Sequence, residues 1–189
     1  MMALPKGEWA TKLRTMRHYN AIARRYDELY GSEQLAKMKL VEQGIRIEAE
    51  EVILDVGCGT GLLFDLIAPK VKLLIGLDIS FEQLKIAYKK MKRFNNVQLI
   101  RADAEHIPFR ENIFDKVVAV TLLQNLTDPE RFLREVIRIN KPHGECVITA
   151  LKKKFDKDKL ISLLRKAELD FRFLEEETKD YIVLCRRFK

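Results

Sequence analysis

The ten residues Val52–Gly61 constrain the fold of this chain more than any other stretch. They read Val-Ile-Leu-Asp-Val-Gly-Cys-Gly-Thr-Gly, an apolar run that passes directly into a glycine-rich turn. Such a run predicts a buried strand of a parallel sheet, and the residues from about Leu62 are expected to begin a helix. Because glycine has no Cβ and adopts positive φ, Gly57, Gly59 and Gly61 allow a ligand close to the backbone at the helix start. This order of elements predicts a nucleotide-type binding site.

The spacing of the glycines separates two classes of ligand. A dinucleotide fingerprint is G-x-G-x-x-G, with a pyrophosphate at the helix N-terminus. Here the pattern closes one residue early, at Gly61, and Leu62 follows it. This favours a ligand without a pyrophosphate over the nicotinamide cofactor of an oxidoreductase. Asp78 ends the next apolar run, where a carboxylate can accept hydrogen bonds from both hydroxyls of a ribose.

From these residues onward the sequence resembles the class I (Rossmann-like) S-adenosylmethionine-dependent methyltransferases. Leu54–Gly61 is similar to their first motif, and Asp78 to the acidic end of their second. The resemblance extends from about Glu50 to the C-terminus and implies S-adenosylmethionine as the cofactor. Three later segments are similar to the adenine-contacting segment, the fourth-strand motif and the helix and turn before the fifth strand: 101–105, 114–125 and 128–144.

The resemblance implies a set of cofactor-binding residues. Asp55 would brace the glycine loop near the methionine part of the cofactor, although a capping carboxylate is an equal alternative. Cys58 has no basic partner nearby in the sequence, so we interpret it as a small loop filler rather than a nucleophile. Asp103 would lie on the adenine side, or else cap the segment after the third strand. The full set is Tyr26, Asp55, Gly57, Cys58, Gly59, Gly61, Asp78, Ile79, Asp103 and Ala104.

Polar residues after the fourth predicted strand are the candidates for handling the methyl acceptor. They are Thr121, Gln124 and Asn125, the last two standing where many relatives have a histidine. None is a strong base, so hydrogen bonding to the acceptor is favoured over proton abstraction. The chain also lacks the Asp/Asn-Pro-Pro-aromatic tetrapeptide that many amino methyltransferases of nucleic acid bases carry there.

Alternating strand and helix patterns predict an α/β, doubly wound, mostly parallel seven-stranded sheet with a C-terminal antiparallel hairpin and an N-terminal helical lid. After the first strand, the predicted strands are 71–77, 97–100, 117–123 and 146–151, and the predicted helices are 81–93, 129–139 and 156–167. The runs 171–174 and 181–185 are too close together for a helical crossover, so they are expected to pair antiparallel.

We expect a single domain over residues 1–189, with a helical lid over 1–48 and the Rossmann-like core over 50–189. Apolar positions between Trp9 and Glu48 recur at helical spacing, with Gly31 as the expected break and Ser32 as the cap of a second helix. The pair Tyr26-Asp27 resembles a lid pair that covers the cofactor in many small methyltransferases. The alternative is that the tyrosines only anchor the helix to the core.

Charge is the main sequence clue to the acceptor. The net charge of +7 and pI of 9.3 favour a polyanionic substrate, and we hypothesise ribosomal or transfer RNA. An ordinary solvated surface, a small-molecule acceptor, and a cofactor-binding subunit that needs a partner protein remain alternatives. The basic clusters are Lys85, Lys89 and Lys90 on one predicted helix and Lys152, Lys153 and Lys154 after the fifth strand.

Cysteine usage and the absence of targeting signals predict a cytoplasmic protein. The three cysteines have no metal-ligand spacing, no secretory signal is visible, and no apolar run approaches the roughly 20 residues that a membrane helix needs. We therefore predict no metal and no membrane association.

Overall fold

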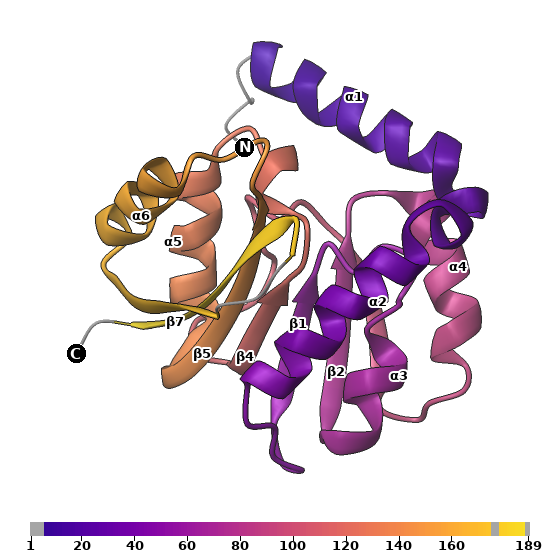
Figure 1. Ribbon diagram of the computed structural model, residues 1–189. Coiled ribbons are helices and arrows are strands. Elements are labelled where there is room, and N and C mark those ends of the chain that lie inside the picture. The colour runs from indigo at the N-terminus through magenta and orange to yellow at the C-terminus, as the bar shows by residue number, and fades with distance from the viewer. Residues whose placement is uncertain (1–5, 175–177, 188–189) are drawn as a thin grey trace.

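Seven strands form one mixed sheet in the computed structural model, which describes residues 6–174 and 178–187 (Figure 1). The strand order is β3-β2-β1-β4-β5-β7-β6. The first five strands pair parallel, whereas β7 lies antiparallel between β5 and β6. The strands are β1 (Val52–Val56), β2 (Leu73–Asp78), β3 (Val97–Arg101), β4 (Phe114–Ala119), β5 (Asn140–Leu151), β6 (Leu169–Leu174) and β7 (Asp180–Arg187). The predicted parallel sheet with a closing antiparallel hairpin is confirmed.

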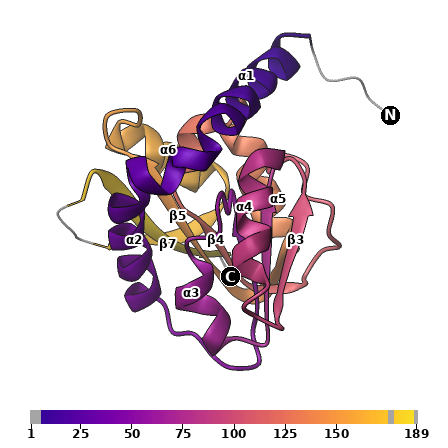
Figure 2. The ribbon, with the colours of Figure 1, turned by 90° about the vertical axis from the view of Figure 1, so that its right-hand side faces the viewer.

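Helices cover both faces of this sheet (Figure 2). In the part of the chain that the structure describes, six are α-helices: α1 (Lys6–Ile22), α2 (Tyr26–Gly44), α3 (Phe64–Ile67), α4 (Phe81–Met91), α5 (Pro129–Ile139) and α6 (Lys157–Lys166). Three short 3₁₀ segments, η1 (Ala23–Arg25), η2 (Ala68–Lys70) and η3 (Leu123–Asn125), join neighbouring elements. None of the helices in the described ranges combines the length and apolarity needed to span a bilayer.

Two apolar cores lie on opposite faces of the sheet because successive side chains of a strand point to opposite sides. Leu54 of β1 packs in the core that α5 and α6 cover, through residues such as Phe132 and Leu164. Ile53, its neighbour, packs in the core that α2, α3 and α4 cover, with Val41 and Phe64. The sheet is therefore fixed from both sides, and the loops at the carboxyl ends of its strands rest on a rigid base.

The N-terminal helices break at a different residue from the one predicted. Gly31 and Ser32 lie inside α2, and the chain turns instead at η1. No side chain caps either end of this turn, and it is held by Ala23, which is buried beside α4. The break is set by packing between distant segments, so the local glycine signal was misleading.

Two element ends near the predicted site also differ. The expected strand 117–123 ends at Ala119, because Thr121 adopts a left-handed φ of 57° that a strand cannot continue through. The helix expected from Leu62 begins at Phe64 and has only four residues before η2. Both differences lengthen the loops that follow β1 and β4, and these two loops form part of the pocket described next.

Candidate active site

The glycine loop after β1 is folded back on the neighbouring strand β2. The amide N–H groups of Gly57 and Cys58 both donate to the carbonyl of Leu77, at 2.7 and 3.0 Å. Gly57, Gly59 and Gly61 have φ values of 75°, 55° and 76°. A Cβ on Gly61 would lie 2.4 Å from the ring of Phe64, which no real side chain tolerates. The loop conformation therefore requires glycine, as the motif predicts.

Asp78 connects this loop to the end of β2. Its carboxylate accepts hydrogen bonds from the backbone N–H groups of Gly59 and Ser80, each at 2.8 Å. Burial raises the pKa of Asp78 above its ordinary value, although these backbone donors oppose the shift. The carboxyl group thus faces the loop at the position where the sequence placed a ribose contact.

Asp55 and Cys58 lie beneath the loop in the protein interior. Asp55 is 2% exposed, and burial together with the nearby Asp78 raises its pKa to about 8. Burial, reinforced by Asp55 and Asp78, also raises the pKa of the Cys58 thiol well above its usual range. A thiol with a raised pKa is a poor nucleophile. This environment agrees with the interpretation of Cys58 as a loop filler.

Helices α1 and α2 bring two tyrosines over the loop. Tyr19 and Tyr26 lie 6.2 Å apart between ring centroids, and burial raises the pKa of both hydroxyls, so both remain protonated. Asp27, next to Tyr26, is exposed and accepts hydrogen bonds from Thr60 of the glycine loop and from Lys90 of α4. The start of α2 is thereby tied to the glycine loop.

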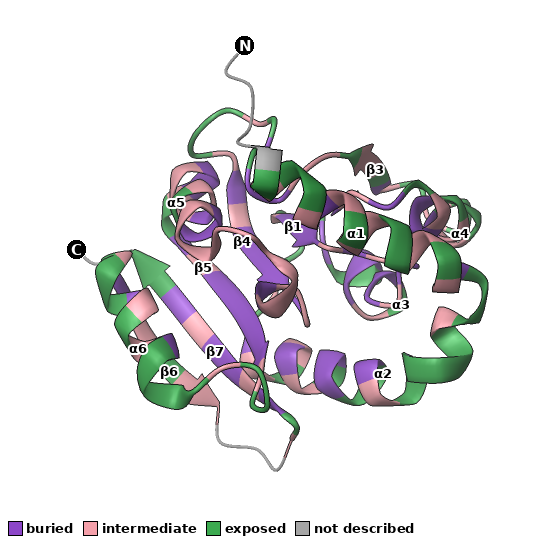
Figure 3. Cartoon of the chain, turned by 90° about the horizontal axis from the view of Figure 1, so that it is seen from above, coloured by how far each residue is buried: buried purple, intermediate pink, exposed green. Residues whose placement is uncertain are grey.

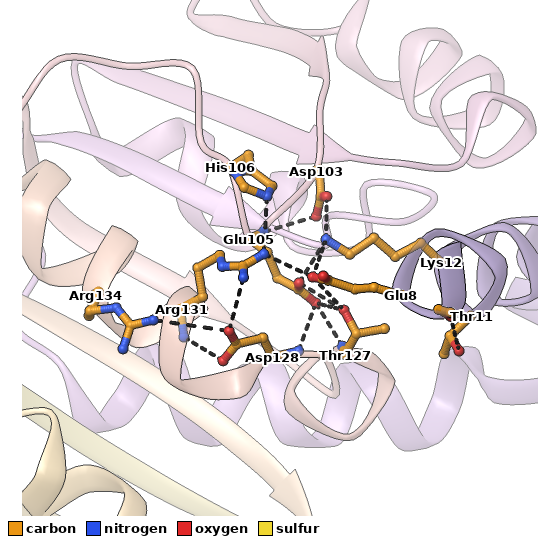
Figure 4. Close-up of polar contacts among 11 residues, drawn as sticks. Glu8, Thr11, Lys12, Asp103, Glu105, His106, Thr127, Asp128, Arg131 and Arg134 are labelled. Atoms are coloured by element: carbon orange, nitrogen blue, oxygen red, sulfur yellow. Dashed lines mark hydrogen bonds and ion pairs between the residues drawn. The ribbon is translucent and has the colours of Figure 1, made fainter. Parts of the chain in front are cut away.

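The segment after β3 carries a cluster of charged side chains (Figure 4). Lys12 of α1 contacts Asp103 at 2.6 Å and Glu105 at 2.7 Å. Burial lowers the pKa of Lys12, but the hydrogen bonds to these two carboxylates outweigh it and raise the pKa above its usual value. Glu105 also accepts hydrogen bonds from the hydroxyl and backbone N–H of Thr127. Hydrogen bonds hold the Glu105 pKa below its ordinary value despite burial.

The polar residues after β4 have different environments. The Thr121 hydroxyl donates to Gln34 of α2 at 3.0 Å, and Gln124 donates to the Thr121 carbonyl at 2.6 Å. Asn125 donates from Nδ2 to the Tyr19 hydroxyl at 2.9 Å and to the same Thr121 carbonyl at 3.0 Å. Its Oδ1 is therefore the group that Asn125 can offer as an acceptor of hydrogen bonds.

These segments line a pocket at the carboxyl ends of β1, β2 and β4, and the pocket is partly open to solvent. Nine of the predicted site residues line it: Tyr26, Gly57, Gly59, Asp78, Ile79, Asp103, Ala104, Thr121 and Asn125. Asp55, Cys58, Gly61 and Gln124 are not among the lining residues, and they support the loops from behind.

Lys12, Thr15, Tyr19 and Glu105 also line the pocket, and nothing in the sequence indicated a role for Lys12 or Thr15. Lys12, Thr15 and Tyr19 are spaced by three and four residues, so they share one face of α1. The spacing indicates a shared helix face, but it does not indicate what that face covers. Glu105 follows Asp103 by two residues, but its role depends on Lys12, which is far away in the sequence.

The lining fits the cofactor that the sequence motifs predict. Asp78 can accept hydrogen bonds from ribose hydroxyls, and Asp103 and Ala104 offer one polar and one apolar contact to an adenine. Gln83 Oε1 is buried in the wall with no partner among the described residues, and a Cβ on Gly59 would lie 3.6 Å from it. A buried hydrogen-bond acceptor without a partner, next to a glycine that leaves space in front of the backbone, can receive a donor group of a ligand.

When bound, S-adenosylmethionine supplies a methyl group activated by its sulfonium. The residues of this chain then have to hold the acceptor atom in line with the bond that breaks, and they have to exclude water. Such positioning can lower the activation barrier by on the order of several kcal/mol. Tyr19 and Tyr26 cover the pocket, and Asn125 can orient an acceptor through Oδ1. No three His, Cys, Asp or Glu side chains gather as metal ligands within the described ranges.

Known proteins share both the sequence motifs and the fold of this chain. The methyltransferase domain family matches residues 54–148, half of the chain. An uncharacterised protein of Methanocaldococcus jannaschii is 35% identical over 144 residues, and a demethylmenaquinone methyltransferase of Thermotoga maritima is 34% identical over 149 residues. The alignments cover 73% and 75% of this chain, but only 52% and 63% of those two proteins.

A solved structure has the same fold. It is a complex between the Haloferax volcanii Trm112 methyltransferase activator and a methyltransferase, and it matches with a TM-score of 0.83 over 93% of this chain and 98% of that chain, at 15% sequence identity. The family predicted from the motifs, and with it the family's cofactor S-adenosylmethionine, is confirmed. The chain belongs to the methyltransferase domain family, within the class I S-adenosylmethionine-dependent methyltransferases.

Proposed function

We propose that this methyltransferase acts on a small molecule that enters the pocket beneath α1. The observation that carries the proposal is the roof of the pocket, where Lys12, Thr15 and Tyr19 of α1 meet Tyr26 of α2. A pocket closed over by two helices suits a compact acceptor better than a base that must remain attached to a polynucleotide. The related demethylmenaquinone methyltransferase is named for a small acceptor, which supports a small-molecule acceptor for this chain too.

The basic clusters that suggested RNA do not belong to this pocket. None of the six lysines lines it. Lys85 pairs with Glu82 at 2.7 Å, and Lys90 pairs with Asp27 at 2.8 Å. Lys152 lies over the ring of Tyr181, 5.6 Å from its centroid. Half of these lysines therefore have local partners, and a general excess of positive charge is weak support for an RNA acceptor.

Two polar side chains that line the pocket restrict the kinds of acceptor that it can serve. Burial keeps Tyr19 protonated, so it serves as a hydrogen-bond donor, and Asn125 Oδ1 serves as an acceptor. Neither group is a base at neutral pH. The acceptor is therefore a small molecule whose nucleophilic atom needs no strong base, such as an acidic hydroxyl or an activated carbon. Leu122 and Leu126 add an apolar wall for a ring.

Transfer of a labelled methyl group tests the proposal. The purified protein and labelled S-adenosylmethionine are incubated with RNA and with a small-molecule extract, both from a strain that lacks this gene. Asp78→Asn is the matched control for background transfer. Label in the small-molecule fraction alone is expected. Label in RNA would overturn the proposal, and so would label in neither fraction with normal cofactor binding, which would favour a subunit that needs a partner protein.

A further inference from the structure

Helix α1 is attached to the rest of the protein mainly by polar contacts. Its apolar residues within 7–22 are half-buried or exposed, and none belongs to either apolar core. Figure 3 shows α1 mostly in the colours of exposed and half-buried residues. Helix α2, in contrast, contributes Met38 and Val41 to a core. Detaching α1 would therefore expose little apolar surface that the cores bury. Specific hydrogen bonds and ion pairs are therefore a substantial part of what holds α1 in place.

Lys12 makes the most buried of these contacts. The residue is only 6% exposed, and its ammonium group lies between Asp103 and Glu105 at 2.6 and 2.7 Å. Glu8, one helical turn earlier, lies 3.7 Å from the same ammonium and 2.8 Å from Arg131 of α5. Figure 4 shows these side chains converging from α1, the segment after β3, and α5. A buried ion pair is costly to break by removing one partner.

The same contacts close the pocket. Lys12 and Asp103 are both lining residues, so the ion pair that holds the helix also lies at the edge of the cofactor site. Tyr19 and Asn20, further along α1, reach Asn125 and Ser80 at 2.9 and 2.7 Å. While these contacts are made, a ligand that fills the pocket lies beneath α1.

We propose that α1 is a gate over the cofactor site and that Lys12 is its latch, the residue whose ion pairs keep the helix closed. Entry and exit of the cofactor require α1 to lift, and the Lys12 pairs with Asp103 and Glu105 set how often it does. The proposal rests on the cofactor site and not on the identity of the acceptor, so binding measurements without any acceptor test it. Lid motions of this kind limit exchange in many enzymes.

A gate and a simple binding contact predict different kinetics. Removing a binding contact raises the dissociation rate and leaves the association rate unchanged. Weakening a latch raises both rates, because the closed helix blocks both directions, and the dissociation constant changes less than either rate. This difference makes Lys12→Met informative, since methionine keeps the length and apolar stem of lysine but removes its charge.

Stopped-flow binding of S-adenosylhomocysteine measures the two rates. We expect Lys12→Met to raise both the association rate and the dissociation rate by at least about tenfold. A tenfold change corresponds to about 1.4 kcal/mol. Arg14→Met is the matched control, because Arg14 is an exposed cation on the same helix whose hydrogen bond is to Thr11 of α1 itself. It should leave both rates unchanged. Unchanged rates in Lys12→Met, or a rise in dissociation alone, would overturn the proposal.

Hydrogen exchange of the ligand-free protein gives a readout that is independent of binding. The amides of α1 should exchange faster in Lys12→Met and in Glu8→Gln than in the wild type, with α4 and α5 unchanged. High salt should speed exchange of α1 in the wild type more than in Lys12→Met, because salt favours the state with separated charges. Equal protection of α1 in the wild type and Lys12→Met would contradict the latch.

Discussion

Asp55 makes the stability of the cofactor-free protein fall as the pH rises, and Asp55→Asn should remove that dependence. Its pKa is raised from 3.8 to about 8, and its Oδ2 has no hydrogen-bond partner among the described residues. The folded state therefore holds this proton more tightly than the unfolded state. The resulting stability is fully present below the ordinary pKa and is lost as the pH rises toward 8. From about pH 5 to about pH 8 the loss is on the order of 4 kcal/mol, at about 1.4 kcal/mol per unit.

Urea unfolding at these two pH values measures the effect. Asparagine has nearly the shape of a protonated aspartate, so Asp55→Asn should exceed the unfolding free energy of the wild type near pH 8 by about 4 kcal/mol more than it does near pH 5. Asp115→Asn is the control. Although partial burial opposes it, the hydrogen bond with Lys141 holds the Asp115 pKa below its ordinary value, so this carboxylate is ionised in both states throughout the range. A difference between Asp55→Asn and wild type that does not change with pH would refute this reasoning.

Three further substitutions test two glycine positions and the ribose contact. Gly61→Ala should lower the unfolding free energy by about 2 to 5 kcal/mol, since a positive φ and a clash with Phe64 add together. Gly31→Ala, inside α2 with only ordinary contacts around its Cβ position, should instead stabilise by up to about 1 kcal/mol in the same urea titration. Asp78→Ala should weaken S-adenosylhomocysteine binding at least about tenfold by calorimetry, since a charged acceptor is lost; unchanged affinity would remove Asp78 from the site.

The sheet was predictable because its signals are local. Each strand of the parallel part contains a short apolar run, and the glycine spacing after β1 marks a turn that only glycine can adopt. The end of β4 was not predictable in this way. Thr121 takes a left-handed φ, which a β-branched residue avoids, so nothing in its identity marks the turn. Its backbone N–H donates to the hydroxyl of Thr149, and that distant contact fixes the conformation.

The residues of the candidate site also divide into those that a local sequence signal marks and those that it does not. Residues inside the motifs, such as Gly59, Asp78 and Asp103, could be placed on the pocket from the resemblance alone. Lys12 could not, because its partner Asp103 is 91 residues away and a single lysine in an exposed helix carries no local signal. The net charge of the whole chain was even less informative about the site, because it is a sum over the entire surface and does not reflect the charges that line the pocket.

The sign of the charge around the pocket also argues against a polyanionic acceptor there. The chain carries a net charge of +7, but the charged groups that line the pocket are the carboxyl groups of Asp78, Asp103 and Glu105 and the ammonium of Lys12. Three acids against one base give the lining an acidic character, which suits a ligand that carries a positive sulfonium and would repel a phosphate backbone. Lys12 offsets part of this charge only while α1 is closed. Opening of the helix would therefore leave the site most acidic when it is accessible, a condition that favours entry of the cationic cofactor over its uncharged-sulfur product.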